Sequence, residues 1–194
     1  MNHSEIILMI QKLIINSGEF AYINGNNRSG KSLFLASLGN RYSHFQGSLR
    51  LNQELVTDKH YSTLIRLIHH DSVVFGDQGI MENIGFGLKS KIEANSDLIN
   101  ILSKFNLPLE KNIKCDRLSL SEQKCVELVR AYMQKPLMLL FDDLDIYFDS
   151  KLFDEIYALL TKMKKNGTII IASGKKPLNS EKQYVIQNKR LELK

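Results

Sequence analysis

Residues 25–32 read Gly25-Asn26-Asn27-Arg28-Ser29-Gly30-Lys31-Ser32, and this stretch decides how the rest of the chain is interpreted. It has the pattern G-x-x-x-x-G-K-S, in which glycines let a loop wrap its backbone N–H groups around a phosphate. In such a P-loop the lysine contacts the β- and γ-phosphates of a nucleotide, and the final hydroxyl is a ligand of Mg²⁺. The sequence therefore predicts that Lys31 binds phosphate and that Ser32 binds Mg²⁺.

The residues around this loop have the strand–loop–helix order that the motif requires. Residues 19–24 are typical of a buried strand, and residues 32–38 predict a helix whose N-terminus faces the phosphate. The alternative is an ordinary glycine-rich turn, which this flanking order makes the weaker interpretation.

The composition is that of a globular protein. The chain has 194 residues, of which 43% are hydrophobic and 24% charged, so it forms one domain with a sizeable core. No run reaches the roughly 18 apolar residues of a membrane span, and no signal peptide is recognisable. The net charge of +5 indicates either a solvated surface or attraction to phosphate, nucleic acid or an anionic membrane. Cys115 and Cys125 are unpatterned, which favours free thiols in the cytosol.

Strands and helices alternate along the chain. Strands are expected at 5–15, 47–52, 64–68, 137–141, 168–172, 184–186 and 190–193, the last two as a closing hairpin. Helices are expected at 80–88, 96–105, 119–133 and 151–165. This alternation predicts an α/β fold with a mainly parallel sheet and a helix-rich middle third.

Two carboxylates follow the apolar run 137–141, which is typical of a fully buried parallel strand. A P-loop needs an acid at such a position to hold Mg²⁺ through water, so Asp142 is the predicted second metal residue. Asp143 comes next and is a candidate for orienting the attacking water. The alternative is a pair of acids that merely begin a helix.

Several further motifs have the order and spacing of one family. They are the turn Gly18-Glu19-Phe20, the segment Leu118-Ser119-Leu120-Ser121-Glu122 at a signature L-S-G-G-Q position, the helix 126–131, the D-loop position Phe148-Asp149, and residues 74–88. Over nearly its whole length the chain resembles the ATP-binding subunits of ABC transporters. Its spacing is most similar to the subgroups of cell division (FtsE), lipid trafficking (Mla) and lipoprotein release (Lol).

The resemblance implies a P-loop NTPase of ABC type over residues 1–194, with a helical subdomain at about 79–135. ATP and Mg²⁺ would bind between two subunits of a head-to-tail homodimer or heterodimer. The implied nucleotide contacts are Asn26, Asn27, Arg28, Ser29, Gly30, Lys31, Ser32 and Phe34 of one subunit, with Ser119 and Ser121 of the other. The implied partner is an integral membrane permease-like protein that docks near residues 71–90. The protein would then lie on the cytoplasmic face of the inner membrane.

The chain departs from the family where hydrolysis is performed. The Q-loop glutamine position holds His70, and imidazole is a poorer ligand for Mg²⁺ than a carbonyl oxygen. Leu120 and Ser121 replace the signature glycines, Asp143 stands at the catalytic glutamate position, and Gly174 stands at the switch-histidine position. His70 and Asp143 are therefore the candidate catalytic residues of a slow ATPase, and the neighbouring His69 is interpreted as a strand-end histidine.

Ser119 and Glu122 also form the pattern S-x-x-E, which predicts a capping box at a helix N-terminus. Capping and phosphate binding are compatible, because a capped helix N-terminus still attracts a phosphate.

Two other functions stay open. One is an ATP-binding switch without significant hydrolysis. The other is a soluble ABC ATPase that acts on DNA, which only the positive charge suggests. Nucleic acid is the less favoured partner, since a chain of 194 residues has no room for a long coiled-coil insertion.

Overall fold

The computed structural model describes residues 13–40, 48–51, 54–88, 96–108, 113–175, 179–188 and 190–194. Most of the strand expected at 5–15 therefore lies outside the described residues, and residues 13–15 adopt neither helix nor strand.

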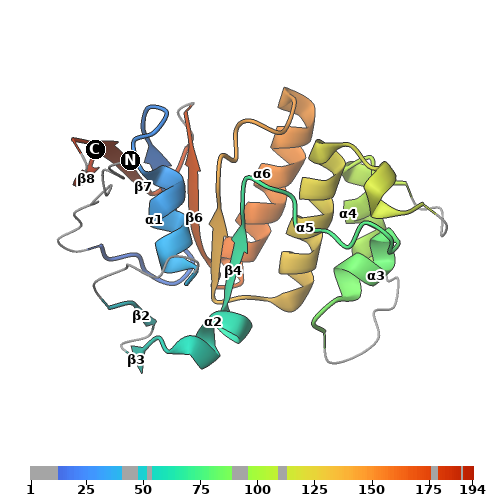
Figure 1. Ribbon diagram of the computed structural model, residues 1–194, viewed down its shortest axis with the longest axis horizontal. Coiled ribbons are helices and arrows are strands. Elements are labelled where there is room, and N and C mark those ends of the chain that lie inside the picture. Colours follow the sequence, from blue (N-terminus) through green and yellow to red (C-terminus); the bar gives the residue numbers. More distant parts are fainter. Residues whose placement is uncertain are drawn as a thin grey trace, which may run out of the picture.

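A six-stranded sheet in the order β4-β5-β6-β1-β7-β8 forms the centre of the structure (Figure 1). Its strands are β1 Phe20–Asn24, β4 Ile65–Ile68, β5 Met138–Phe141, β6 Ile169–Gly174, β7 Lys182–Gln187 and β8 Arg190–Leu193. The first five pair in parallel, and β8 pairs antiparallel with β7 as the expected hairpin. The α/β fold with a mainly parallel sheet is thus confirmed.

The helices are α1 Lys31–Leu38, α2 Asp58–Leu64, α3 Ile80–Gly85, α4 Ser96–Lys104, α5 Leu120–Gln134 and α6 Ser150–Lys165, with the 3₁₀ turn η1 Cys115–Arg117. Two short strands, β2 Arg50–Leu51 and β3 Glu54–Leu55, pair antiparallel. Helix α2 was not expected, because its sequence is polar and has no apolar period. Among the described helices, none has the length and apolar character needed to cross a membrane.

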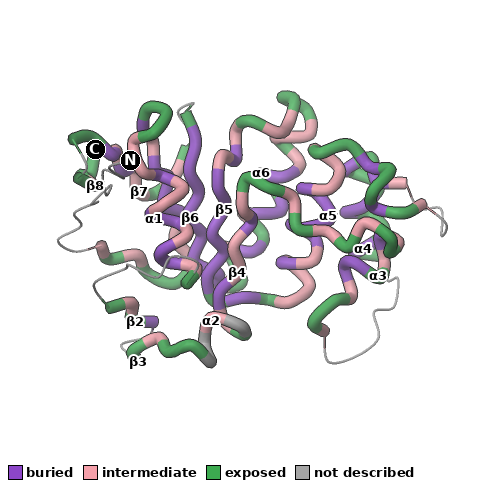
Figure 2. The backbone as a smooth tube through the Cα atoms, in the orientation of Figure 1, coloured by how far each residue is buried: buried purple, intermediate pink, exposed green. Residues whose placement is uncertain are grey.

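The sheet separates two apolar cores, and Figure 2 shows its central strands almost continuously buried. Alternate residues of β5 belong to different cores: Leu139 and Phe141 pack with α5 and α6, whereas Met138 and Leu140 pack with α1. A parallel strand buried on both faces is apolar throughout, which is the pattern of residues 137–141. This layering places the start of α1 and the end of β5 at the same edge of the sheet.

Arg130 of α5 binds the segment after β4 at two points. Arg130 donates hydrogen bonds to the backbone oxygen of Val73 at 2.9 Å and to the backbone oxygen of Asn83 at 2.7 Å. The buried Asn83 side chain in turn accepts a hydrogen bond from the Phe75 N–H at 2.8 Å. These contacts hold the connection between the sheet and α3 in one conformation.

Candidate nucleotide-binding site

The P-loop connects β1 to α1 and is closed by its own lysine. Lys31 is only 6% exposed, and its ammonium group donates hydrogen bonds to the backbone oxygens of Gly25 at 2.8 Å and Asn26 at 3.2 Å. Gly30 has φ 109°, a conformation that side chains disfavour, and a Cβ at Gly25 would lie 2.6 Å from the hydroxyl of Ser29. The backbone path therefore requires glycine at position 30, and the nearby Ser29 side chain leaves little space for a side chain at position 25.

A hollow of about 270 Å³ opens at this loop. It is lined by Asn24, Gly25, Asn26, Asn27 and Lys175. No side chain caps the N-terminus of α1, so its first N–H groups and the positive end of the helix dipole face the loop. The backbone N–H groups of the loop and the ammonium group of Lys175 therefore surround one hollow and form a site for an anion.

The other predicted P-loop contacts differ in how far their side chains are exposed to solvent. Asn26, Asn27 and Arg28 are exposed, and Ser32 is half-buried at the start of α1. The Phe34 side chain is 3% exposed and packs in the core with Leu35, so it offers almost no side-chain surface to a ligand. Its predicted contact with a nucleotide stays a prediction.

Asp142 lies at the end of β5 and is completely buried. Its backbone N–H donates to the oxygen of Ile68 at 2.9 Å, and its Oδ1 accepts a hydrogen bond from the hydroxyl of Ser173 at 2.6 Å. Its Oδ2 has no hydrogen-bond partner among the described residues. A buried carboxylate oxygen without a partner is costly, and a cation beside it would remove that cost.

Asp143 follows with φ 52°, and its backbone N–H donates to the Ser173 hydroxyl at 2.9 Å. Burial raises the pKa of the Asp143 carboxyl, the neighbouring Asp142 raises it further, and Lys31 opposes the rise. Asp143 therefore lies within electrostatic reach of both the P-loop lysine and the buried carboxylate.

His70 approaches the same carboxylate from the neighbouring strand. Its Nδ1 lies 3.9 Å from Oδ2 of Asp142, and its backbone oxygen accepts a hydrogen bond from Tyr147 at 3.0 Å. Strand β4 pairs with β5 so that Ile68 stands opposite Phe141, which brings the residues after both strands together. The structure thus brings together the side chains of His70 and Asp142, which were predicted separately from the sequence.

Lys124 and Glu127 belong to the same region and were missed from the sequence. The fully buried Lys124 ammonium lies 3.1 Å from Glu127 Oε1 and donates to the backbone oxygens of His69 and of Asp71, the latter at 2.9 Å. Glu127 accepts the Val73 N–H at 3.0 Å. The sequence pattern that could have predicted this pair is a lysine and a glutamate three residues apart on the apolar face of a helix.

With this geometry established, comparison with known proteins identifies the family. The family model described as ABC transporter matches residues 8–144, which is more than half of the chain. This chain belongs to the ABC transporter family. The predicted resemblance is confirmed.

Curated relatives of this ABC protein have modest identity. The cell division ATP-binding protein FtsE of Mycobacterium tuberculosis is 28% identical over 81% of this chain and 73% of the relative. The lipoprotein-releasing system ATP-binding protein LolD of Buchnera aphidicola is 27% identical over 82% of this chain and 75% of the relative.

Solved structures confirm the fold. The ATP-binding cassette MJ0796, solved as a dimer in a post-hydrolysis state with ADP and Pi, superposes with a TM-score of 0.77 at 22% identity, over 93% of this chain and 86% of that one. A putative ABC transporter ATP-binding protein from Pyrococcus furiosus superposes with a TM-score of 0.78 at 15% identity, over 95% of this chain and 92% of that one. The P-loop NTPase fold of ABC type is thereby established.

The signature segment of this ABC protein begins α5. Ser119 is the N-cap: its hydroxyl accepts the Glu122 N–H at 3.3 Å, while the Glu122 carboxylate accepts the Ser119 N–H at 2.7 Å. The predicted capping box is confirmed. Figure 1 shows the start of α5, which this segment forms, apart from the loop between β1 and α1 of the same chain.

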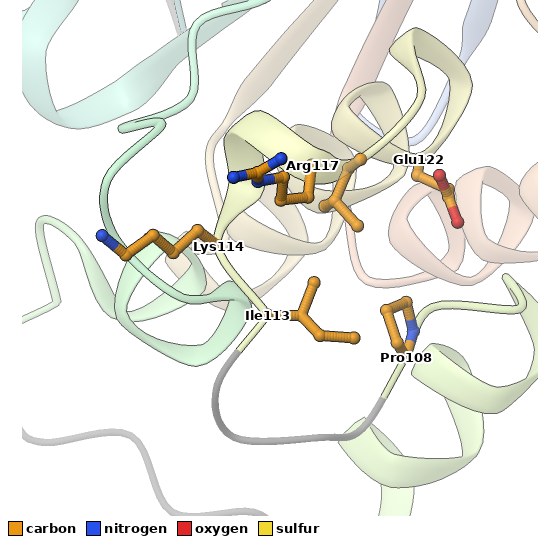
Figure 3. A pocket seen from close by; sticks show the side chains of 6 residues that line it. Pro108, Ile113, Lys114, Arg117 and Glu122 are labelled. Atoms are coloured by element: carbon orange, nitrogen blue, oxygen red, sulfur yellow. The ribbon is translucent and has the colours of Figure 1, made fainter.

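A second hollow, of about 540 Å³, lies beside this signature segment (Figure 3). It is lined by Pro108, Ile113, Lys114, Arg117, Leu118 and Glu122. Pro108 and Ile113 lie on one side of it, and Arg117 lies on the other (Figure 3). The hollow shares no lining residue with the P-loop and so belongs to a different part of the ABC protein.

Proposed function

We propose that this chain is the ATP-binding subunit of an ABC-type membrane complex and binds Mg·ATP at the P-loop. The observation that carries the proposal is the buried Asp142, whose unpartnered Oδ2 lies at the same sheet edge as the loop closed by Lys31. Lys31 and Ser32 would hold the phosphates and Mg²⁺, and Asp142 would hold Mg²⁺ through water. ATP supplies the phosphoryl group to be transferred.

Hydrolysis would be slow, with Asp143 orienting the attacking water. Its raised pKa suits a group that accepts a proton, but its side chain is one methylene shorter than that of glutamate. The second candidate is a binding switch in which ATP closes the complex without significant hydrolysis. The crowding around Gly174 favours it, because that position has no space for another phosphate-contacting side chain.

A head-to-tail dimer would complete each site with Ser119 and Ser121 of a second subunit. Two large exposed apolar side chains beside predicted dimer contacts support this proposal. Leu120, between Ser119 and Ser121, is 49% exposed, and Ile146, two residues before the D-loop position Phe148-Asp149, is 50% exposed. The partner would be a second copy of this chain or another ABC subunit. We also propose that residues at about 79–135 form a helical subdomain of this single domain.

The membrane partner would dock on the segment after β4, within residues 71–90. Phe75 and Phe86 are 40% and 57% exposed, and their rings pack at a tilt of 53° with centroids 4.5 Å apart. Val73, 46% exposed, lies on the same fastened segment. Such a rigid apolar surface suits a short apolar element of an integral membrane protein, which would hold this subunit on the cytoplasmic face of the inner membrane.

Titration calorimetry with Mg·ATP tests the binding proposal. Lys31→Ala should weaken binding by about tenfold or more, about 1.4 kcal/mol, because the lysine offsets phosphate charge. Lys151→Ala, which removes an exposed lysine at the start of α6, should bind as the wild type does. Equal affinity of the wild type and Lys31→Ala would refute the proposal.

Steady-state phosphate release distinguishes a slow ATPase from a binding switch. A turnover that depends on Mg·ATP and is lost in Lys31→Ala supports the ATPase. Copurification from membranes tests the partner. Phe86→Ser should reduce recovery of the membrane protein while leaving ATP affinity unchanged, because Phe86 is exposed and ends α3, a helix far from the loop between β1 and α1 (Figure 1).

A further inference from the structure

Three potential metal ligands from two adjacent strand ends converge at one point. One ring nitrogen each of His69 and His70 and one carboxylate oxygen of Asp142 lie within 4.8 Å of one another. The histidines follow β4 and the aspartate follows β5, so strand pairing produces the cluster. Ligands bound to one ion at about 2.0–2.2 Å can be at most about 4.4 Å apart, so small side-chain rotations would close this cluster on a cation.

The buried oxygen of Asp142 is the independent sign that a ligand belongs there. Asp142 is completely buried, and Ser173 satisfies its Oδ1. Its Oδ2 lacks a hydrogen-bond partner in the described part of the chain and faces the imidazole of His70 at 3.9 Å. That distance is too long for a hydrogen bond, and it leaves room for a shared ion.

The second nitrogen of His70 is held in the way that metal-binding histidines are held. Nε2 lies 3.3 Å from Oδ2 of Asp71, while Nδ1 points toward Asp142. Metal-binding histidines almost always offer their other nitrogen to a carboxylate or carbonyl group, which fixes the ring and makes it a stronger ligand. Asp71 is therefore a positioning residue for His70.

The backbone that carries both histidines is fixed as well. Lys124 donates to the oxygen of His69, and Tyr147 donates to that of His70. The positive charge of Lys124 is paired with Glu127 at 3.1 Å, so it does not stand alone beside the cluster. The ligands are therefore positioned before any ion binds, which reduces the free-energy cost of ordering them.

We propose that His69, His70 and Asp142 form a binding site for a divalent transition metal that favours imidazole, the class of Zn²⁺ and Co²⁺. Two imidazoles and one carboxylate, with an open fourth position, are a common ligand set for such ions. Mg²⁺ strongly prefers oxygen ligands and does not fit this donor set. Under this proposal His69, which was interpreted as a strand-end histidine, is also a metal ligand.

The transition metal and the Mg²⁺ of Mg·ATP would compete for Asp142. The site itself is formed by side chains of the chain alone and needs no nucleotide. Metal binding can therefore be measured without ATP, and a negative result would leave the proposal of ATP binding untouched.

Titration of the nucleotide-free, full-length protein with Co²⁺, followed by visible absorption, tests this site. The wild type should develop a saturable d–d band at one equivalent, and Zn²⁺ should abolish it at far lower concentration than Mg²⁺. His69→Gln and His70→Gln should each weaken Co²⁺ binding by about tenfold or more, as loss of a ligand does. His60→Gln, a substitution at a sequence position of α2, is the matched control and should bind as the wild type does.

Two results would overturn the proposal. One is the absence of saturable Co²⁺ absorption in the wild type. The other is an equal effect of His60→Gln and the two cluster variants, which would indicate adventitious binding to scattered histidines. Both cluster histidines are partly exposed, at 30% and 48% of their side chains, so the glutamine variants should fold.

A second measurement connects the site to the nucleotide. The affinity for ATP is compared with Co²⁺ and with Mg²⁺ in the wild type and in His70→Gln. The variant has an amide oxygen in place of an imidazole, so the ratio of the two affinities should shift toward Mg²⁺ by about tenfold. An unchanged ratio would show that His70 does not contact the metal.

Discussion

The hydroxyl of Tyr22 occupies the space that a side chain at Gly174 would need. A Cβ at Gly174 would lie 1.9 Å from Tyr22 Oη and 2.3 Å from Oδ1 of Asp145. Tyr22 is in β1, and Gly174 ends the neighbouring strand β6, so the contact is set by strand pairing. Gly174, which the sequence resemblance places at the switch-histidine position, therefore cannot accept a histidine unless Tyr22 or Asp145 moves.

Substitution at this position should show the crowding directly. Gly174→Ala should destabilise the protein by about 1–3 kcal/mol in urea unfolding, because overpacking forces buried groups apart. Tyr22→Phe removes the nearest atom, so Gly174→Ala should cost less in that background. Tyr22→Phe alone should be nearly neutral, since the hydroxyl is buried without a hydrogen-bond partner among the described residues. Equal stability of Gly174→Ala and the wild type would disprove the crowding.

Lengthening the carboxylate at position 143 should raise turnover. Asp143→Glu moves the carboxylate roughly 1.5 Å further, and an error near 1 Å in position can cost about a hundredfold in rate. We expect kcat to rise by about tenfold while ATP affinity stays within a few-fold, because binding depends on the P-loop. Asp143 has φ 52°, which favours aspartate over glutamate, so a small loss of stability should accompany the gain.

The assay for this variant is steady-state phosphate release with the copurified membrane partner present. Asp154→Glu, an exposed position on α6, is the control for adding a methylene elsewhere. If Asp143→Glu leaves kcat unchanged or lower, the limiting defect lies at His70, Leu120 or Ser121, and the binding switch becomes the better interpretation.

The buried pair of Lys124 and Glu127 should contribute strongly to stability. Lys124→Met removes the partner of a buried carboxylate, so the free energy of unfolding should fall by about 3–5 kcal/mol. Adding Glu127→Gln should recover part of this loss, because the amide still accepts the Val73 N–H without a buried charge. Lys104→Met breaks the half-exposed pair with Glu155 and should cost at most about 1 kcal/mol. Similar losses in both lysine variants would contradict this view.

Glu19 should make stability depend on pH in the acid range. Burial raises the pKa of Glu19, but hydrogen bonds from Lys182 and Asn16 outweigh it and lower that pKa from 4.5 to about 2. The ionised form is therefore favoured by folding: its contribution is complete above pH 4.5 and is lost as the pH falls through about 2.

Glu19→Gln should accordingly be less stable than the wild type at neutral pH, and the difference should shrink as the pH falls from about 4.5 toward 2. Thermal unfolding across this range measures it. Glu192→Gln, at an exposed position in β8, serves as the reference. A difference between Glu19→Gln and the wild type that stays constant with pH would contradict the depressed pKa of Glu19.

The sequence by itself determined the local features of this protein. The P-loop, its flanking strand and helix, and the buried strand before Asp142 follow from residue spacing and apolar runs, which act over a few neighbouring residues. The capping box of Ser119 and Glu122 is local for the same reason. Helix α2 escaped prediction because nothing in its own sequence distinguishes it from a polar loop.

Only the tertiary structure decided which of these features meet. The order β4-β5-β6-β1 brings His69 and His70 to Asp142 and places Tyr22 over Gly174, although each pair is far apart in the sequence. Strand order depends on how helices cover both faces of the sheet, and no local pattern encodes it. The P-loop and Asp142 are thus predicted from short motifs, whereas the cluster of His69, His70 and Asp142 and the crowding at Gly174 arise from the pairing of distant strands.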